Sequence, residues 1–122
     1  MIVAISGSRS IRQLPQQAID KLDKIMELRA TIYVGDAYGV DAAVQSYLHN
    51  KGYREVTVWY GRYLRNNIGG WPTVGCVGGY TDRDREMHAH SDYALAIWDG
   101  VSKGTRRNIQ QMGKKIRVVQ VS

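Results

Sequence analysis

Three short segments of this 122-residue chain combine glycine with hydroxyl and charged side chains. Glycine lets a backbone approach an anion closely, the start of a helix presents free N–H groups, and Ser or Thr hydroxyls add further donors. One such segment alone commonly serves turn geometry only, but three together favour a phosphate-binding site. The candidate ligand-binding residues are Gly7, Ser8 and Arg9 in the first segment, Gly35, Asp36, Gly39 and Asp41 in the second, and Asp99, Gly100, Ser102, Lys103, Gly104 and Thr105 in the third.

The charged members of these segments allow more than one interpretation. Arg9 is either a bidentate phosphate ligand, which we favour, or a solvated surface residue. Asp36 and Asp41 either accept hydrogen bonds from a ribose or cap the helix that follows them. Asp99 ends an apolar run, where it either faces a ribose or orients the neighbouring turn.

Hydrophobic patterning predicts the elements that position these segments. Apolar and β-branched runs predict strands at Ile2–Ile5, Thr31–Val34, Glu55–Tyr60, Tyr93–Trp98 and Ile116–Val121. Apolar residues at helical spacing predict helices that start at Pro15, cover 40–48, and end near Gly113. A further helix is expected over 82–91, started by Thr81 with Asp84 in an imperfect capping box.

Strands that alternate with helices predict an α/β fold. We expect a single Rossmann-like domain over residues 1–122, with three layers and a mostly parallel sheet of about five strands. In such a sheet ligands bind outside the carboxyl ends of the strands, where the three segments should lie together. Residues 61–81 break the rhythm with scattered glycines, so we predict a long loop there, either a lid or a merely disordered insertion.

Composition narrows the choice of partner. Seventeen Lys and Arg against eleven Asp and Glu give a net charge of +6, which favours an anionic partner and leaves nucleic acid and phosphorylated small molecules open. The apolar runs are too short to span a membrane, so we predict a cytoplasmic protein with no membrane partner. Cys76 is the only cysteine, and His88 and His90 fall on different faces of a helix, so we predict neither a metal site nor another cofactor.

Two common nucleotide motifs are absent from the sequence. Neither the G-x-G-x-x-G fingerprint nor a Walker A motif occurs, which argues against an NAD-dependent dehydrogenase and against an NTPase motor.

Four stretches, taken in order, resemble the motifs of a known family. They are Ile5-Ser6-Gly7-Ser8-Arg9, Gly35-Asp36-Ala37-Tyr38-Gly39-Val40-Asp41, Arg83 with Met87, and Trp98-Asp99-Gly100-Val101-Ser102-Lys103-Gly104-Thr105. The chain resembles the SLOG superfamily, which relates the DNA-processing protein DprA (also called SMF) to the LOG phosphoribohydrolases, and within it the YspA-like, cpYpsA-related branch. The resemblance implies a Rossmann-like domain whose turns hold the phosphate and ribose of a nucleotide, often in a dimer or larger homo-oligomer.

One departure from the LOG pattern bears on catalysis. The LOG signature reads Pro-Gly-Gly-x-Gly-Thr-x-x-Glu, and here Asn108 occupies the position of the glutamate. Cleavage of an N-glycosidic bond would use a carboxylate to stabilise charge or activate water, and an amide cannot ionise. Glu86, Asp41 or Asp84 would have to substitute, with Arg83 on the phosphate.

Three functions follow as hypotheses. The first is binding of a nucleotide or nucleotide-derived ligand, such as an ADP-ribose-type signal, by a module that senses or sequesters it. The second is a nucleotide N-glycosidase that resembles the LOG enzymes, with Glu86, Asp41 and Arg83 as candidate catalytic residues. The third is a DprA-like binder of single-stranded nucleic acid, motivated by the net charge and by the Lys and Arg residues between 103 and 117. An aromatic residue near the long loop could stack on a base; the candidates are Trp59, Tyr60, Tyr63, Trp71 and Tyr80.

Overall fold

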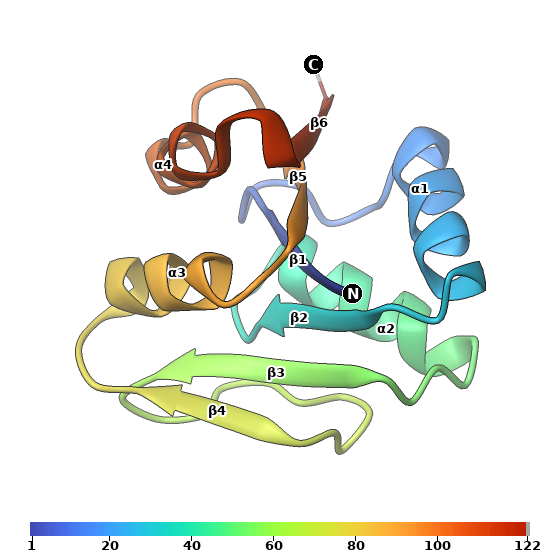
Figure 1. Cartoon of the computed structure of the whole chain (residues 1–122), viewed down its shortest axis with the longest axis horizontal. Helices are drawn as coiled ribbons and strands as arrows, with labels where there is room; N and C mark the ends of the chain where they lie inside the picture. The colour runs from blue at the N-terminus through green and yellow to red at the C-terminus, as the bar shows by residue number, and fades with distance from the viewer. Residues whose placement is uncertain (122) are drawn as a thin grey trace.

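A computed structural model describes residues 1–121 and confirms the α/β, Rossmann-like class (Figure 1). Its sheet has six parallel strands in the order β4-β3-β2-β1-β5-β6, one strand more than the sequence predicts. The strands are β1 (Ile2–Gly7), β2 (Thr31–Gly35), β3 (Val56–Gly61), β4 (Thr73–Cys76), β5 (Tyr93–Trp98) and β6 (Ile116–Gln120). The helices are α1 (Gln16–Glu27), α2 (Val40–Asn50), α3 (Tyr80–Ala89), α4 (Lys103–Met112) and the short 3-10 turn η1 (Gly113–Lys115).

The two faces of the sheet carry separate apolar clusters. Ala18 and Leu22 of α1 pack with Val44 of α2 on one face, together with strand residues such as Ile5. On the other face Met87 of α3 and Met112 of α4 pack on alanines of β1 and β5. Figure 1 shows α3 and α4 on the opposite side of the sheet from α1. None of the helices in the described part of the chain is long and apolar enough to cross a membrane.

The extra strand lies within the stretch predicted as a loop. Thr73–Cys76 forms β4, which pairs in parallel with β3 at the edge of the sheet. Sequence patterning missed it because an edge strand needs no continuous apolar run, and here Thr73 and Gly75 are exposed. The preceding residues pack against α2, where the Gln45 side chain binds the Asn66 carbonyl and the Ile68 N–H.

The start of α3 also differs from the prediction. The helix begins at Tyr80 rather than Asp82, and Gly79 is its N-cap. The Gly79 N–H donates to the Asp82 carboxylate at 3.0 Å, so the capping pair is Gly79 with Asp82 and not Thr81 with Asp84.

The strand order creates one switch point. From β1 the chain adds β2, β3 and β4 successively on one side, and then returns to place β5 on the other side of β1. The crossover helices of the two halves therefore leave the sheet on opposite faces, and the turns after β1 and β5 diverge. In open parallel sheets this is the place where ligands bind.

Candidate functional site

A cavity of about 310 Å³ opens at the carboxyl ends of β1 and β5, and we call it the switch-point pocket. Eight of the predicted ligand-binding residues line it, and they come from all three glycine-bearing segments and from α3. They are Gly7, Ser8, Arg9, Asp41, Arg83, Ser102, Gly104 and Thr105. The structure thus brings the three segments together at one edge of the sheet, as the sequence predicts.

The wall beside β5 is the N-terminus of α4. Its N-cap is Ser102, whose side chain makes no capping hydrogen bond, and no acidic residue lies in the first turn of the helix. Free N–H groups and the positive end of the helix dipole therefore belong to the same wall as Gly104 and Thr105. Such a wall suits an anion.

Asp99 orders the turn that leads into this helix. Its carboxylate accepts hydrogen bonds from the N–H groups of Val101 and Ser102 and from the hydroxyls of Ser10 and Ser102, at 2.8–2.9 Å. These bonds, those from the two backbone N–H groups above all, hold the pKa of Asp99 well below its usual value. Asp99 orients the turn and does not line the pocket.

The wall beside β1 is built by close packing. A Cβ on Gly7 would lie 2.3 Å from the Ile97 carbonyl oxygen, so only glycine fits where β1 leaves the sheet. Ser8 Oγ accepts the Asp99 N–H at 3.0 Å, which ties the turns after β1 and β5 together. Ser6 also lines the pocket, and its buried hydroxyl has no hydrogen-bond partner within the described chain.

The second segment supports the pocket from behind. A Cβ on Gly35 would lie 1.6 Å from Arg83 Nη1, and a Cβ on Gly39, whose φ is +74°, would lie 2.4 Å from the Arg9 carbonyl oxygen. Asp36 is buried, and it accepts bonds from the backbone and side chain of Arg65 at 2.8 and 2.7 Å. Neither Gly35, Gly39 nor Asp36 lines the pocket. No side chain caps α2, so neither Asp36 nor Asp41 has the predicted capping role.

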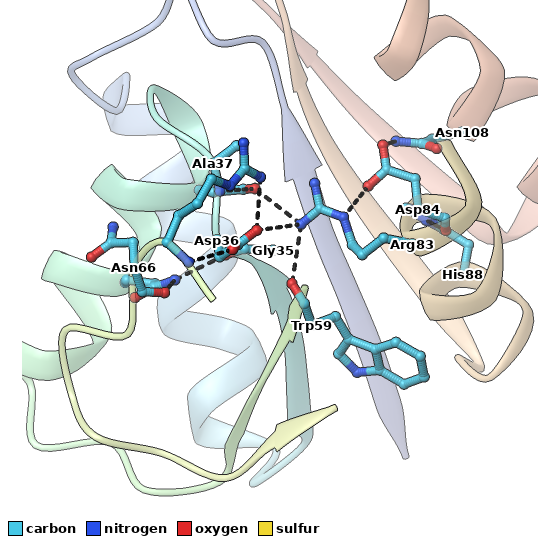
Figure 2. A network of polar contacts seen from close by, with 12 residues as sticks. Gly35, Asp36, Ala37, Trp59, Asn66, Arg83, Asp84, His88 and Asn108 are labelled. Atoms are coloured by element: carbon cyan, nitrogen blue, oxygen red, sulfur yellow. Dashed lines mark hydrogen bonds and ion pairs between the residues drawn. The ribbon is translucent and has the colours of Figure 1, made fainter. Parts of the chain in front are cut away.

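Arg83 is the centre of a buried network of charges (Figure 2). Its guanidinium lies 3.5 Å from Asp41 and 3.7 Å from Asp36 through Nη1, and 3.0 Å from Asp84 through Nε. Nη1 also donates to the Trp59 carbonyl oxygen at 3.3 Å. Arg83 is only 4% exposed, so these contacts fix its position.

The network holds more negative than positive groups. Three carboxylates, those of Asp36, Asp41 and Asp84, face the guanidinium groups of Arg83 and Arg65. Burial, opposed in part by Arg83, raises the pKa of Asp41 from 3.8 to about 6. Asp41 is therefore a carboxyl group that can exchange a proton near neutral pH, and it lines the pocket.

Asp84 links this network to Asn108 of α4. Asn108 Nδ2 donates to Asp84 Oδ2 at 3.4 Å, and both residues line the pocket. His88 supports Asp84 from α3, because its Nδ1 donates to the Asp84 carbonyl oxygen at 2.8 Å. Burial lowers the pKa of His88, so its neutral imidazole ring makes this bond to the Asp84 carbonyl within α3.

The rim of the pocket is cationic and aromatic. Arg9 and Arg107 line it together with Tyr80 and Thr81. The guanidinium groups of Arg9 and Arg65 lie 5.4 and 3.9 Å from the centre of the Tyr80 ring. Tyr80 is thus the aromatic residue, among those predicted to stack on a base, that the structure places at the pocket.

Other predicted residues lie elsewhere. Glu86 is exposed on α3, 3.7 Å from His90 Nε2, and it does not line the pocket. One turn of helix separates it from Arg83, but its side chain faces solvent. Lys103 is exposed, and Gly100 (φ +86°) packs near the Gln120 side chain. Within residues 1–121, no three or more His, Cys, Asp and Glu side chains gather as metal ligands would.

The sequence reasoning did not select several lining residues. Asn108 enters the sequence prediction only as the replacement of the LOG glutamate, and Arg107 only as part of the basic run. Both follow Gly104 by three or four positions and so share its face of α4, a spacing that could have placed them at the site. Thr81 belongs to the first turn of α3. The sequence predicts that the helix begins at Asp82, two residues after its observed start at Tyr80. Nothing in the sequence distinguished Ser6 from other small residues in a buried strand.

The basic residues between 103 and 117 do not form one surface. Arg107 lines the switch-point pocket, and the Arg106 guanidinium lies 5.6 Å from the centre of the Trp98 ring. Lys114, Lys115 and Arg117 lie around a different cavity.

In comparisons with known proteins, no family model, no curated protein and no solved structure matches this chain. Membership of the SLOG superfamily therefore stays a prediction from the motifs.

Proposed function

We propose that this protein binds a nucleotide or nucleotide-derived ligand, such as an ADP-ribose-type signal, in the switch-point pocket, and that it senses or sequesters that ligand. The observation that carries the proposal is the set of hydrogen-bond donors that line one pocket. They are the backbone N–H groups at the start of α4, the unpartnered hydroxyl of Ser6, and the guanidinium groups of Arg9 and Arg107. Within the described residues no carboxylate pairs with either guanidinium group, and the internal bond of Arg107 is a long one to Thr81 Oγ1 at 3.4 Å, so these donors are available to an incoming phosphate. The volume of about 310 Å³ lies at the lower end of the range for small-molecule sites.

The two halves of the pocket suit two parts of one ligand. Donors gather beside Gly104 and Arg107, whereas the carboxylates of Asp41 and Asp84 are acceptors on the side of α2 and α3. A phosphate would occupy the first half, and ribose hydroxyls would donate to the second. Tyr80 lies at the rim, where a base can stack on its ring.

A substitution at Gly104 tests the site. The nearest atom to a Cβ added there is Arg107 Nη2 at 3.8 Å, so valine fits without strain and projects into the space of the ligand. A proton NMR spectrum of a mixture of nucleoside monophosphates, NAD, ADP-ribose and cyclic ADP-ribose identifies the ligand by selective broadening. Calorimetry with that ligand should then show a loss of affinity of at least about tenfold for Gly104→Val.

The matched control is Gln110→Val, which places the same side chain at an exposed position of the same helix. Its affinity should equal that of the unmodified protein. Equal affinities in all three proteins would remove the switch-point pocket as the binding site, and no broadening of any nucleotide would remove the proposal.

A second candidate function is a nucleotide N-glycosidase, and the protonation of Asp41 favours it. A carboxyl group whose pKa is about 6 can donate or accept a proton near neutral pH, as hydrolysis of an N-glycosidic bond by water requires. If the protein catalyses this reaction, free base should appear in the NMR spectra over hours. Asp41→Asn should abolish the release while binding persists, and Glu86→Gln, outside the pocket, should not. Free base that never appears would decide for the binding module.

A homo-oligomer is part of the proposal. Large apolar side chains follow the carboxyl ends of four strands and are strongly exposed: Tyr38 (76%), Tyr63 (67%), Val77 (101%) and Val101 (73%). A second copy that covers this edge would bury them and narrow the pocket. Sedimentation at several protein concentrations tests it, and Val101→Glu should shift the protein toward the monomer; a monomer at every concentration would contradict it.

A further inference from the structure

A second cavity, of about 350 Å³, lies at the opposite end of the sheet, where the strands begin. It is bounded by α1 and by the first residues of β1, β5 and β6, and we call it the amino-edge pocket. It shares no residue with the switch-point pocket. Of the candidate functional residues identified in the sequence it includes only Lys114, Lys115 and Arg117 from the basic run, and no part of the proposed function uses it.

The base of this pocket is apolar and buried. Val3 and Leu95 line it from neighbouring strands, and they are 5% and 2% exposed. Ile25 of α1 adds a partly buried side wall. Tyr93 lines the same pocket but is half exposed, so apolar surface continues from the buried base to solvent. Exposed apolar surface that continues into a cavity is typical of a binding site.

Five cationic side chains surround this apolar base. Lys21 and Lys24 come from one face of α1, and Lys114, Lys115 and Arg117 come from η1 and β6. None of the five takes part in an ion pair within residues 1–121.

The nearby carboxylates have other partners. Asp92 accepts the Ile2 N–H at 2.7 Å, Asp23 accepts the Tyr47 hydroxyl, and Asp20 accepts the Gln16 amide. These carboxylates keep their charge, but within the described chain none of them forms an ion pair with the five cations around the pocket. Like charges gathered at one site repel, and an anion among them removes that repulsion.

We propose that the amino-edge pocket binds a small organic carboxylate with an apolar body, of which a medium-chain fatty acid is the simplest. The apolar body lies on Val3 and Leu95, and the carboxylate lies among the lysines. Long lysine side chains can keep their methylene groups on apolar surface while their ammonium groups reach the carboxylate. The positive charge around the pocket thus favours an anionic amphiphile over a neutral or cationic one.

The first experiment uses the unmodified full chain and a series of straight-chain carboxylates. Amide chemical shifts in a two-dimensional ¹⁵N spectrum should move at Leu95 and Arg117 on addition of octanoate. The affinity, measured by calorimetry, should rise about fourfold for each added methylene from hexanoate to decanoate, since each is removed from water. Octyltrimethylammonium should bind more weakly than octanoate.

The second experiment compares two double variants that change the net charge equally. Lys21→Glu with Lys114→Glu alters the pocket, whereas Lys51→Glu with Arg54→Glu alters exposed residues outside it. Octanoate affinity should fall at least about tenfold in the first and less than about twofold in the second. A cooperative unfolding curve verifies that each variant is folded. The chain-length series uses only the unmodified protein, so it tests the proposal even if a variant does not fold.

Several results would overturn the proposal. One is the absence of shifts at Leu95 and Arg117 with octanoate at millimolar concentration. Another is an affinity that does not depend on chain length, and a third is an equal loss in the two double variants, which would indicate a general charge effect. Binding of a short polythymidine at these residues without any carboxylate binding would overturn it in favour of nucleic acid.

Discussion

The two pockets of this protein have similar volumes, about 310 and 350 Å³, but they use charge in opposite ways. At the base of the switch-point pocket the charged side chains are buried and paired, with Arg83 4% and Asp41 5% exposed, whereas Arg9 and Arg107 at its rim are exposed. In the amino-edge pocket the apolar side chains are buried, and the surrounding cations have no carboxylate partner within the described residues. One pocket thus has fixed charges at its base, and the other has an apolar base with mobile charges around it.

This difference indicates what each pocket can recognise. Arg83 is held by three carboxylates and packs directly on the backbone at Gly35, so the charged groups at the base of the switch-point pocket are fixed before a ligand arrives. Fixed dipoles and charges in a water-poor site discriminate strongly between ligands. The lysines of the amino-edge pocket are long and free to rotate, so that pocket should accept many anions with an apolar body.

The largest expected effect comes from removal of the central guanidinium. Arg83→Met keeps the apolar stem but leaves Asp36, Asp41 and Asp84 without their shared partner. Loss of one member of a buried ionic network typically lowers the free energy of unfolding by roughly 3–5 kcal/mol. Urea unfolding monitored by tryptophan fluorescence measures the change.

The matched variant in the other pocket is Lys24→Met, because Lys24 is exposed and has no ion-pair partner among residues 1–121. It should alter the free energy of unfolding by no more than about 0.5 kcal/mol. Similar losses in the two variants would contradict the contrast between fixed and mobile charges.

The next effect concerns pH and Asp41. Its pKa is raised from 3.8 to about 6 by folding, so between these values the folded state binds more protons than the unfolded state. The contribution of Asp41 to the free energy of unfolding is therefore most favourable below pH 4, and it is lost as the pH rises toward 6. At about 1.4 kcal/mol per pKa unit, the loss amounts to roughly 3 kcal/mol at most.

Asp41→Asn removes this titration while keeping an acceptor for the Ala37 N–H. The variant should be more stable than the unmodified protein at pH 7 and nearly equal to it at pH 4, as chemical unfolding at several pH values can measure. A constant difference between the two proteins across this range would show that Asp41 does not titrate there. The amino-edge pocket contains no carboxyl group, so Lys24→Met should leave the pH profile unchanged.

The sequence predicted the fold class and much of the switch-point pocket because both depend on local patterns. The run Tyr93–Trp98 is apolar along its whole length, as a strand covered on both faces must be, and the structure gives β5 the same bounds. The turns after β1 and β5 could be placed at one edge because parallel strands end at the same edge. Gly7 and Gly104 were therefore identified without knowledge of their neighbours.

The remaining features depend on tertiary contacts that no local pattern encodes. The exposure of Glu86 depends on which side of α3 meets the sheet, and an arginine one turn earlier does not reveal this. The role of Gly35 depends on Arg83 Nη1, which approaches from α3 far along the chain. The amino-edge pocket brings α1 next to η1, and its lysines look in sequence like any solvated helix face.

The smallest expected effect concerns the repulsion around the amino-edge pocket. Lys21 and Lys24 lie three positions apart on α1 and face the same cavity as three further cations. Lys21→Gln should raise the free energy of unfolding by about 0.2–0.5 kcal/mol at low ionic strength, since it removes a like-charge neighbour. The gain should disappear near 1 M salt, where the Debye length falls to about 3 Å. Octanoate should produce a similar stabilisation in the unmodified protein and less in Lys21→Gln, because the carboxylate relieves the same repulsion. A gain that persists at high salt would mean that Lys21 destabilises α1 through packing, and the charges around this pocket would then be ordinary solvated side chains.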